Sequence, residues 1–232
     1  MAINGDNCLT CKVRNCSILK PCTVTTLSAI STFKTSQKFK KGEYLFEQGS
    51  LNKGVFFIKK GVVKVEIKSA GGRSFIVKIG GRGGIVGHRG SDNKSIQNYT
   101  VTALSEVICC FISTTLFKKI LQGAADLEKQ LSEEYLNDLK LMELRSLSLA
   151  YKTVREKIAE IILLIADLYN YTSKQKSFSI DLTRQDFADL SGTTKEQVSA
   201  ALKDFERNEL IKYSGKKFNF INIQALKAIA NV

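Results

Sequence analysis

The stretch "LTRQDFADLSGTTKEQVSAALKDFERNELI" (residues 182–211) contains two short helical patterns separated by a glycine. Thr183 predicts the N-cap of the first helix, because Asp186 follows three residues later and completes a capping box. Gly192 ends that helix, since glycine is favoured just beyond a helix C-terminus. Two helices joined through a turn that contains glycine are typical of a helix-turn-helix.

The second helix of this stretch begins with a capping box of its own, formed either by Thr193 with Glu196 or by Thr194 with Gln197. Four apolar residues at helical spacing predict its inward face. They are Val198, Ala201, Leu202 and Phe205. The segment "LIKYSGKKFNFINI" (210–223) then alternates on both sides of a Ser-Gly pair, which predicts a β-hairpin wing.

In a winged helix-turn-helix, residues near the N-terminus of the second helix contact bases in the major groove. Glu196 is suited to accept a hydrogen bond from a cytosine amino group, whereas lysines of the helix and the wing neutralise phosphates. The residues expected at the DNA are Thr183, Arg184, Thr194, Lys195, Glu196, Ser199, Lys203 and Lys216. The alternative interpretation makes them solvated side chains of a small helical hairpin.

Upstream, residues 39–113 alternate between apolar and polar side chains, as in "VVKVEIK" (62–68) and "FIVKI" (75–79). Twelve of the sixteen glycines lie between residues 42 and 90, many of them where a strand should turn. This pattern predicts an antiparallel β-barrel or sandwich whose short strands close on themselves.

Residues 124–149 contain no glycine or proline and predict one long helix of about 39 Å. One apolar stripe consists of Leu127, Leu131, Tyr135, Leu139 and Met142. A second apolar surface consists of Leu136, Leu141, Leu144 and Leu147. Because this exceeds what one small domain normally buries, we expect the helix to form a dimer interface. The alternative is a helix that packs only within its own chain.

The 232-residue chain is 44% hydrophobic, which is sufficient for one large or two modest cores. It has neither a signal-like N-terminus nor a run of about 18 apolar residues, so we expect a cytoplasmic protein without a membrane partner. The net charge of +13 favours a polyanionic partner such as double-stranded DNA. Residues 1–100 carry +12 (17 basic, 5 acidic) and the remainder only +1 (18 basic, 17 acidic), so DNA binding by the back half depends on where its charges lie.

Four of the six cysteines lie in "NCLTCKVRNCSILKPC" (7–22), ahead of any segment that predicts a core. In a reducing compartment, clustered cysteines more often bind metal or do redox chemistry than form structural disulfides. Cys8, Cys11, Cys16 and Cys22 have the spacing C-x2-C-x4-C-x5-C, and four thiolates can hold zinc or an iron-sulfur cluster. Redox-active or inert thiols are the third alternative.

The order of barrel, long helix and winged helix-turn-helix resembles the Crp/Fnr family of bacterial transcription regulators over essentially the whole chain. "FKKGEYLFEQGSLNKGVFFIKKGVVKV" (39–65) resembles the family's barrel opening, and residues 182–211 resemble its DNA-reading unit. One departure is Ala200, which stands where an arginine is common, and it leaves the target DNA sequence open.

This resemblance implies an α+β fold with a cyclic-nucleotide-binding-like β-barrel (jelly roll), a long dimerisation helix and a C-terminal winged helix-turn-helix. It also implies a homodimer on two-fold symmetric DNA, with contacts to RNA polymerase. The implied domains are a cysteine-rich arm (1–25), a barrel sensor domain (26–122), the dimerisation helix (123–150) and the DNA-binding domain (151–232).

In the oxygen-sensing Fnr branch, an iron-sulfur cluster is held by an N-terminal cysteine group ending in C-x5-C and by one distant cysteine of the barrel. "CSILKPC" (16–22) resembles that ending, and "EVICCFIS" (106–113) resembles the strand with the distant ligand. The implied ligands of a 4Fe-4S cluster are Cys11, Cys16, Cys22 and Cys110, with Cys8 as a substitute. A self-contained metal site made of Cys8, Cys11, Cys16 and Cys22 is the alternative, with zinc as the rival metal.

Cyclic-nucleotide binders of the family carry a Gly-Glu pair followed by an Arg-Ser pair. This chain has Gly84 and Ile85 and then "SIQNY" (95–99), so cyclic AMP is not expected. The alternative function is a regulator without a cluster, with structural zinc or free thiols, that responds to another small effector in the barrel. An architectural DNA binder without sequence preference is a third class.

We do not expect an enzyme, because the single histidine, His88, lies in a glycine-rich loop without a nucleophile motif. A lone histidine in such a loop is expected to be exposed. For Cys109 and Cys110, simple burial is the alternative to a ligand role, and at most one of two neighbours on a strand can face a given site.

Overall fold

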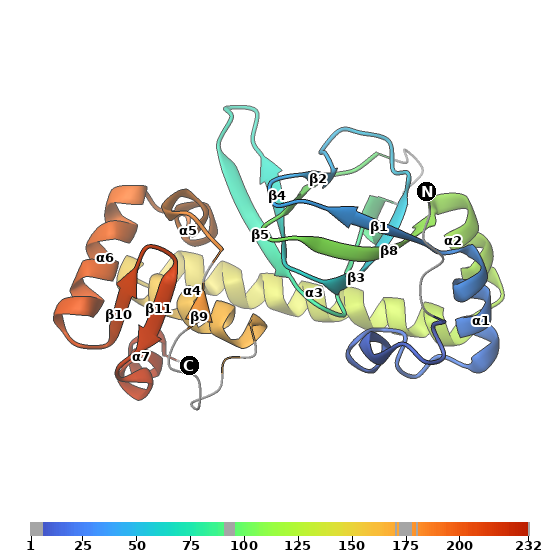
Figure 1. Ribbon diagram of the computed structural model, residues 1–232. Coiled ribbons are helices and arrows are strands. Elements are labelled where there is room, and N and C mark those ends of the chain that lie inside the picture. Colours follow the sequence, from blue (N-terminus) through green and yellow to red (C-terminus); the bar gives the residue numbers. More distant parts are fainter. Residues whose placement is uncertain (1–6, 91–95, 170, 172–177, 180, 232) are drawn as a thin grey trace. The chain divides into compact units, whose positions relative to one another are not determined.

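The computed structural model describes residues 7–90, 96–169, 171, 178–179 and 181–231. It divides into two compact units, a front unit Met1–Lys140 and a back unit Leu141–Val232, whose elements Figure 1 labels. The long helix α3 (Ala125–Tyr151) supplies residues to both units. Ser95 of "SIQNY" and Ile180 lie outside the described residues.

The front unit contains two antiparallel four-stranded sheets, so the predicted jelly roll is a sandwich rather than a fully closed barrel. The first sheet has the order β1 (Thr35–Phe39), β8 (Val107–Ser113), β3 (Gly54–Lys60) and β6 (Ile85–Val86). The second has the order β2 (Tyr44–Phe46), β7 (Thr100–Ala103), β4 (Val63–Lys68) and β5 (Ser74–Gly80).

Short helices gather at one end of the two sheets, together with the N-terminal arm (Figure 1). They are η1 (Lys12–Cys16), α1 (Val24–Phe33) and α2 (Thr114–Gln122), while η2 (His88–Gly90) follows β6. Asp126 of α3 holds the start of α1 by accepting hydrogen bonds from the Thr23 amide (2.6 Å) and the Thr26 hydroxyl (2.8 Å).

The cysteine-rich arm is part of the front unit's hydrophobic core. Cys8, Leu19 and Cys22 are buried in one cluster with side chains of α1, the sheets, α2 and α3. The arm does not form a core of its own. Its apolar residues pack instead into a core that later segments of the chain form.

The back unit is a helical bundle with a three-stranded wing in the order β10 (Ile211–Ser214), β11 (Lys217–Phe220), β9 (Phe178–Ser179). Its helices are α4 (Val154–Leu168), α5 (Arg184–Ser191), α6 (Lys195–Arg207) and α7 (Ile223–Ala230). Phe187, Phe205 and Phe218 are fully buried and tie α5, α6 and the wing into one core.

The local signals of the helix-turn-helix are confirmed. Thr183 and Asp186 form the capping box of α5, and Gly192 ends that helix with a left-handed φ of 62°. Of the two boxes predicted for α6, the one formed by Thr194 and Gln197 is present.

The apolar stripe predicted on α3 divides into two parts. Leu127 and Leu131 are buried in the front unit's own core, whereas Leu139 is exposed and Met142 is half-buried. All residues of the second predicted surface are exposed, namely Leu136, Leu141, Leu144 and Leu147. Among the described helices, α3 included, none has a stretch long and apolar enough to cross a membrane.

Candidate functional site

Helix α6 presents a polar N-terminal surface because its apolar side is taken up by the core. Val198, Ala201, Leu202 and Phe205 are buried as predicted. Of the residues expected at the DNA, the exposed ones are Thr183, Thr194, Lys195, Glu196, Lys203 and Lys216, whereas Arg184 and Ser199 are half-buried. Ser199 also donates its hydroxyl to the Lys195 carbonyl at 2.8 Å.

Glu196 is suited to be a hydrogen-bond acceptor at the tip of this surface. A hydrogen bond from its own backbone amide, and then one from the Thr194 side chain, lower the pKa of the Glu196 carboxyl. The group is therefore ionised at neutral pH and can accept from a base amino group.

The remaining predicted DNA residues frame α6 from α5 and the wing. The Arg184 guanidinium lies 5.0 Å from the centre of the Tyr213 ring, and Lys216 lies 3.7 Å from Asp181. The back unit therefore carries positive groups on α5 and on the wing in addition to those at the N-terminal end of α6.

Two arginines hold the helix-turn-helix against its supporting helices. Arg155 of α4 donates to Asp204 of α6 at 2.7 Å and lies over the Phe205 ring at 5.5 Å. Arg145 of α3 donates to the Leu190 carbonyl at the C-terminal end of α5. Burial lowers the pKa of Arg145 to about 10, which leaves the guanidinium charged at neutral pH.

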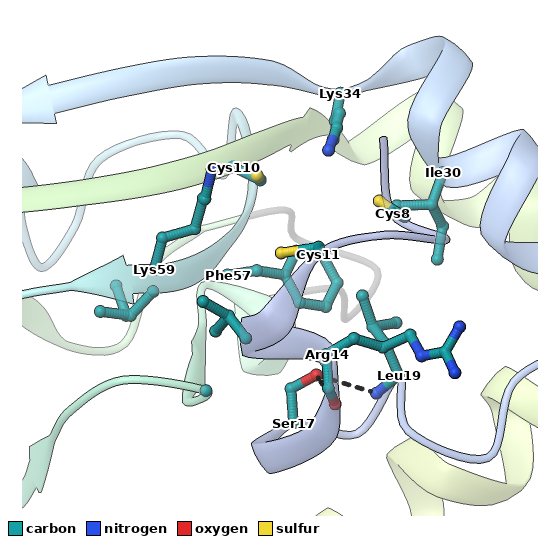
Figure 2. Close-up of a pocket in the computed structure, with 13 residues that line it drawn as sticks. Cys8, Cys11, Arg14, Ser17, Leu19, Ile30, Lys34, Phe57, Lys59 and Cys110 are labelled. Carbon is teal, nitrogen blue, oxygen red and sulfur yellow. Dashed lines mark hydrogen bonds between the residues drawn. The ribbon is translucent and has the colours of Figure 1, made fainter. Parts of the chain in front are cut away.

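In the front unit, three cysteines from distant parts of the chain line one cavity (Figure 2). Cys8 and Cys11 come from the arm, and Cys110 comes from β8, where it pairs with Phe57 and Ser36. The family resemblance implied Cys8 only as a substitute ligand, yet Cys8 lines this cavity together with Cys11 and Cys110.

The other two arm cysteines do not line the cavity. Cys16 is exposed at the end of η1, where its thiol donates to the Val13 carbonyl at 3.2 Å. Cys22 is buried in the adjoining core, and its thiol donates to the Ile18 carbonyl at 3.7 Å. The four residues between Cys11 and Cys16 are wound into η1, which separates these two thiols.

Gly83, which precedes β6 of the first sheet, packs closely against the arm. It has a left-handed φ of 88°, and a Cβ atom at this position would overlap the carbonyl oxygen of Cys16. Since Gly83 also lines the thiol cavity, the close approach that glycine permits fixes the arm beside Cys110.

Two lysines face the cavity thiols in Figure 2. Lys34, only 7% exposed, and Lys59 of β3 line the cavity; the Lys59 nitrogen lies beside Cys110, and the Lys34 nitrogen is directed toward the space between Cys110 and Cys8. Burial raises the pKa of the Cys110 thiol, while the charges of Lys34 and Lys59 act in the opposite direction. Burial therefore disfavours the thiolate form of Cys110, whereas the two cations favour it.

The alternation along β8 separates Cys109 from this site. Cys109 is completely buried, and its thiol donates to the Gln37 carbonyl at 3.7 Å. Burial raises its pKa to about 12. Cys109 therefore has the character of a core residue.

The donor chemistry fits a thiolate-bound group, although the side chains do not converge on one point. In the part of the chain that the structure describes, no three His, Cys, Asp or Glu side chains are placed to hold a single metal ion. Four thiolates around one zinc ion must meet at about 2.3 Å from it. A cubane cluster instead binds one thiolate at each of its irons, so its ligands are spread around a larger group.

A second cavity lies between the sheets and α3. It contains His88, which is buried with 4% exposure rather than exposed as expected, because Tyr135 of α3 covers its ring at 5.3 Å. The prediction failed because this cover comes from a residue 47 positions away. Ile85 and Gly87 also line this cavity, whereas Gly84 is not among its lining residues.

Sequence reasoning missed the charged residues of both cavities. Lys34 and Lys59 face the thiols, while Lys78, Arg89 and Asp138 surround the second cavity. An Asp in the middle of an amphipathic helix gives no local signal of burial. Its position four residues after Glu134 only indicates a shared face.

Comparisons with known proteins agree with both units. Residues 36–124 match the family model of the cyclic nucleotide-binding domain, and residues 156–229 match that of the Crp-like helix-turn-helix domain. The transcriptional activator protein FnrL of Cereibacter sphaeroides is 25% identical over 215 residues, which cover 90% of this chain and 86% of FnrL.

Two further relatives extend the comparison. The cAMP-activated global transcriptional regulator CRP of Salmonella typhimurium is 26% identical over 199 residues, covering 85% of this chain and 94% of CRP. The solved structure of FixK2 from Bradyrhizobium japonicum has a TM-score of 0.74 at 19% identity, covering 84% of this chain and 96% of FixK2, and it shows the same fold.

The burial of the thiols predicts their order of alkylation in the reduced, metal-free protein. We expect iodoacetamide to modify Cys16 first, because it is exposed, and Cys22 and Cys109 last, because burial raises their pKa to about 11 and about 12. Peptide mass spectrometry over time measures the order. In urea the differences should vanish, and equal rates for Cys16 and Cys109 in the folded protein would contradict the described arrangement.

Proposed function

The chain belongs to the Crp/Fnr family of transcription regulators, and from this membership we propose a sequence-specific DNA-binding regulator that senses oxygen, nitric oxide or redox state through a cysteine-ligated iron-sulfur cluster. The observation that carries the sensing part is the cavity where Cys8 and Cys11 of the arm meet Cys110 of the sheet. Contacts to RNA polymerase belong to the same proposal.

DNA reading is assigned to the N-terminal turn of α6. Glu196 supplies an ionised acceptor for a base, while Lys195, Lys203 and Lys216 supply charge for phosphates. Arg155 and Arg145 act as positioning residues, because they fix α6 and α5 without lying on the exposed tip.

Replacing the base-reading acceptor should weaken selectivity rather than general DNA affinity. We expect Glu196→Ala to lose about 1–3 kcal/mol of discrimination at one base pair of the preferred duplex, selected from a random pool. Fluorescence anisotropy at fixed salt measures the loss. Glu206→Ala, which removes the same charge at the opposite end of α6, is the control. Equal binding of selected and scrambled duplexes by the unmodified protein would refute specific reading.

We propose that two chains pair through the exposed leucines of α3. Five of these residues lie within about three helical turns of one another. They are Leu136, Leu139, Leu141, Leu144 and Leu147. Leu127 and Leu131 of the predicted stripe are buried in the core of the front unit, so they do not belong to this surface. Several exposed apolar side chains on one helix are typical of an interaction surface.

A charge placed in the middle of this surface should prevent pairing. We expect Leu144→Glu to sediment as a monomer at concentrations where the unmodified chain sediments as a dimer, because an unpaired carboxylate would be buried. Leu51→Glu, at an exposed leucine of the front unit, is the matched control. A dimeric Leu144→Glu protein, or a monomeric unmodified chain at all concentrations, would contradict the assignment.

The cluster would be held by Cys8, Cys11 and Cys110, with Cys16 or Cys22 as the fourth ligand after movement of the arm. When bound, a cluster supplies electron transfer and sensitivity to oxygen. This chain's own residues provide three thiols in a mostly apolar cavity, with Lys34 and Lys59 to compensate the negative charge of thiolates. Because the thiols lose protons on binding, occupancy should increase with pH.

Cys109 and Cys110 are neighbours on β8, but only Cys110 lines the cavity, so replacing each of them separately tests the proposed cluster. We expect anaerobically purified protein to absorb visible light and contain iron and sulfide, and Cys110→Ser to lose both. Cys109→Ser is the control, because its side chain does not line the cavity. Absorption spectra with iron, sulfide and zinc analysis give the result. Colourless protein with stoichiometric zinc, or equal loss in both variants, would reject the proposed sensor.

A further inference from the structure

A carboxylate of α3 lines the second cavity of the front unit. Asp138 is only 5% exposed, and each of its carboxylate oxygens has a different cationic partner. Oδ1 accepts from the Lys78 ammonium of β5 at 2.7 Å, and Oδ2 accepts from the Arg89 guanidinium of η2. Both cations line the cavity together with Asp138.

Each of the two cations has a further partner as well. Arg89 donates to the Tyr99 hydroxyl at 3.4 Å and lies 5.6 Å from the centre of that ring. Lys78 also donates to Glu134 of α3 at 3.1 Å, but Glu134 is more exposed than Asp138. Asp138 is therefore the main anion for a pair of mostly buried cations.

The surroundings of Asp138 and His88 determine which of these two groups is charged. Burial favours the neutral acid at Asp138, but Lys78 and Arg89 outweigh it and hold the pKa of that carboxyl below its usual value. Burial, followed by the charges of Arg89 and Lys78, lowers the pKa of His88 to about 4. His88 is thus neutral and adds no third cation, and neither of its ring nitrogens has a hydrogen-bond partner among the described residues.

Neighbouring residues of α3 reinforce the same contact. Tyr135 donates its hydroxyl to the His88 carbonyl at 3.1 Å while its ring covers the imidazole. Glu134, Tyr135 and Asp138 therefore all bind the same edge of the second sheet and η2. Separating α3 from this edge would leave two cations in a mostly apolar cavity without their anion.

We propose that Asp138 is a built-in anion for this cavity, which holds α3 against the front unit without any external anionic effector. The carboxylate occupies the place between Lys78 and Arg89 that a small carboxylate or phosphate would have to occupy. An external anion can therefore enter only by displacing α3 from these two cations. This inference requires neither DNA binding nor a cluster, so its failure would leave the proposed function untouched.

Chemical rescue of a missing carboxylate tests the proposal on the full chain. We expect Asp138→Ala to lower the midpoint of thermal unfolding by roughly 6 °C or more, because two buried cations lose their partner. Formate should raise the midpoint of this variant, since it binds the folded state at the vacated place, whereas sodium chloride of the same ionic strength should not.

Glu134→Ala is the matched control, because it removes another carboxylate of α3 that contacts Lys78. We expect a smaller change in its midpoint and no specific response to formate, as for the unmodified chain. An equal midpoint for Asp138→Ala and Glu134→Ala, or an equal formate effect in all three proteins, would overturn the proposal.

A triple variant keeps the test decisive if Asp138→Ala does not fold. Combining Lys78→Met and Arg89→Met with Asp138→Leu removes the cations together with their anion, so this protein should fold and melt above Asp138→Ala. A triple variant that is as unstable as the single variant would show that charge compensation is not the role of Asp138.

Discussion

A charge that folding removes from water needs a compensating partner nearby, and this constraint governs both cavities of the front unit. In the second cavity the partner is built in, because Asp138 accepts from Lys78 and Arg89. In the first cavity Lys34 and Lys59 face three thiols, and no Asp or Glu is among the described residues that line it. The two cavities therefore differ, because the cations of the second contact a carboxylate of α3, whereas the lysines of the first lie beside cysteine thiols.

Helix α3 contributes to several parts of the structure, because residues on its successive turns have different contacts. Leu127 and Leu131 belong to the front core, Asp138 to the second cavity and Arg145 to the support of α5. Its exposed leucines lie between residues 136 and 147. The helix therefore contributes residues to both units.

The sequence predicted most accurately what is decided locally. The capping boxes of α5 and α6, the glycine between them and the wing follow from residues within a few positions of one another, and the structure contains them all. Contacts across the chain were harder to predict. The spacing of the arm cysteines does not reveal that η1 separates Cys11 from Cys16, nor that Cys8 lies with Cys110. Periodicity predicted α3 but did not distinguish Leu127, which is buried within the chain, from Leu139, which is exposed. His88 was misplaced because its cover, Tyr135, is remote in sequence.

The contact between Gly83 and the Cys16 carbonyl restricts which residue position 83 can hold. Any side chain at position 83 would wedge the N-terminal segment away from the sheet, whatever its polarity. The placement of the arm on the sheet thus depends on a position that contributes no side-chain contact and acts only through the space it leaves free.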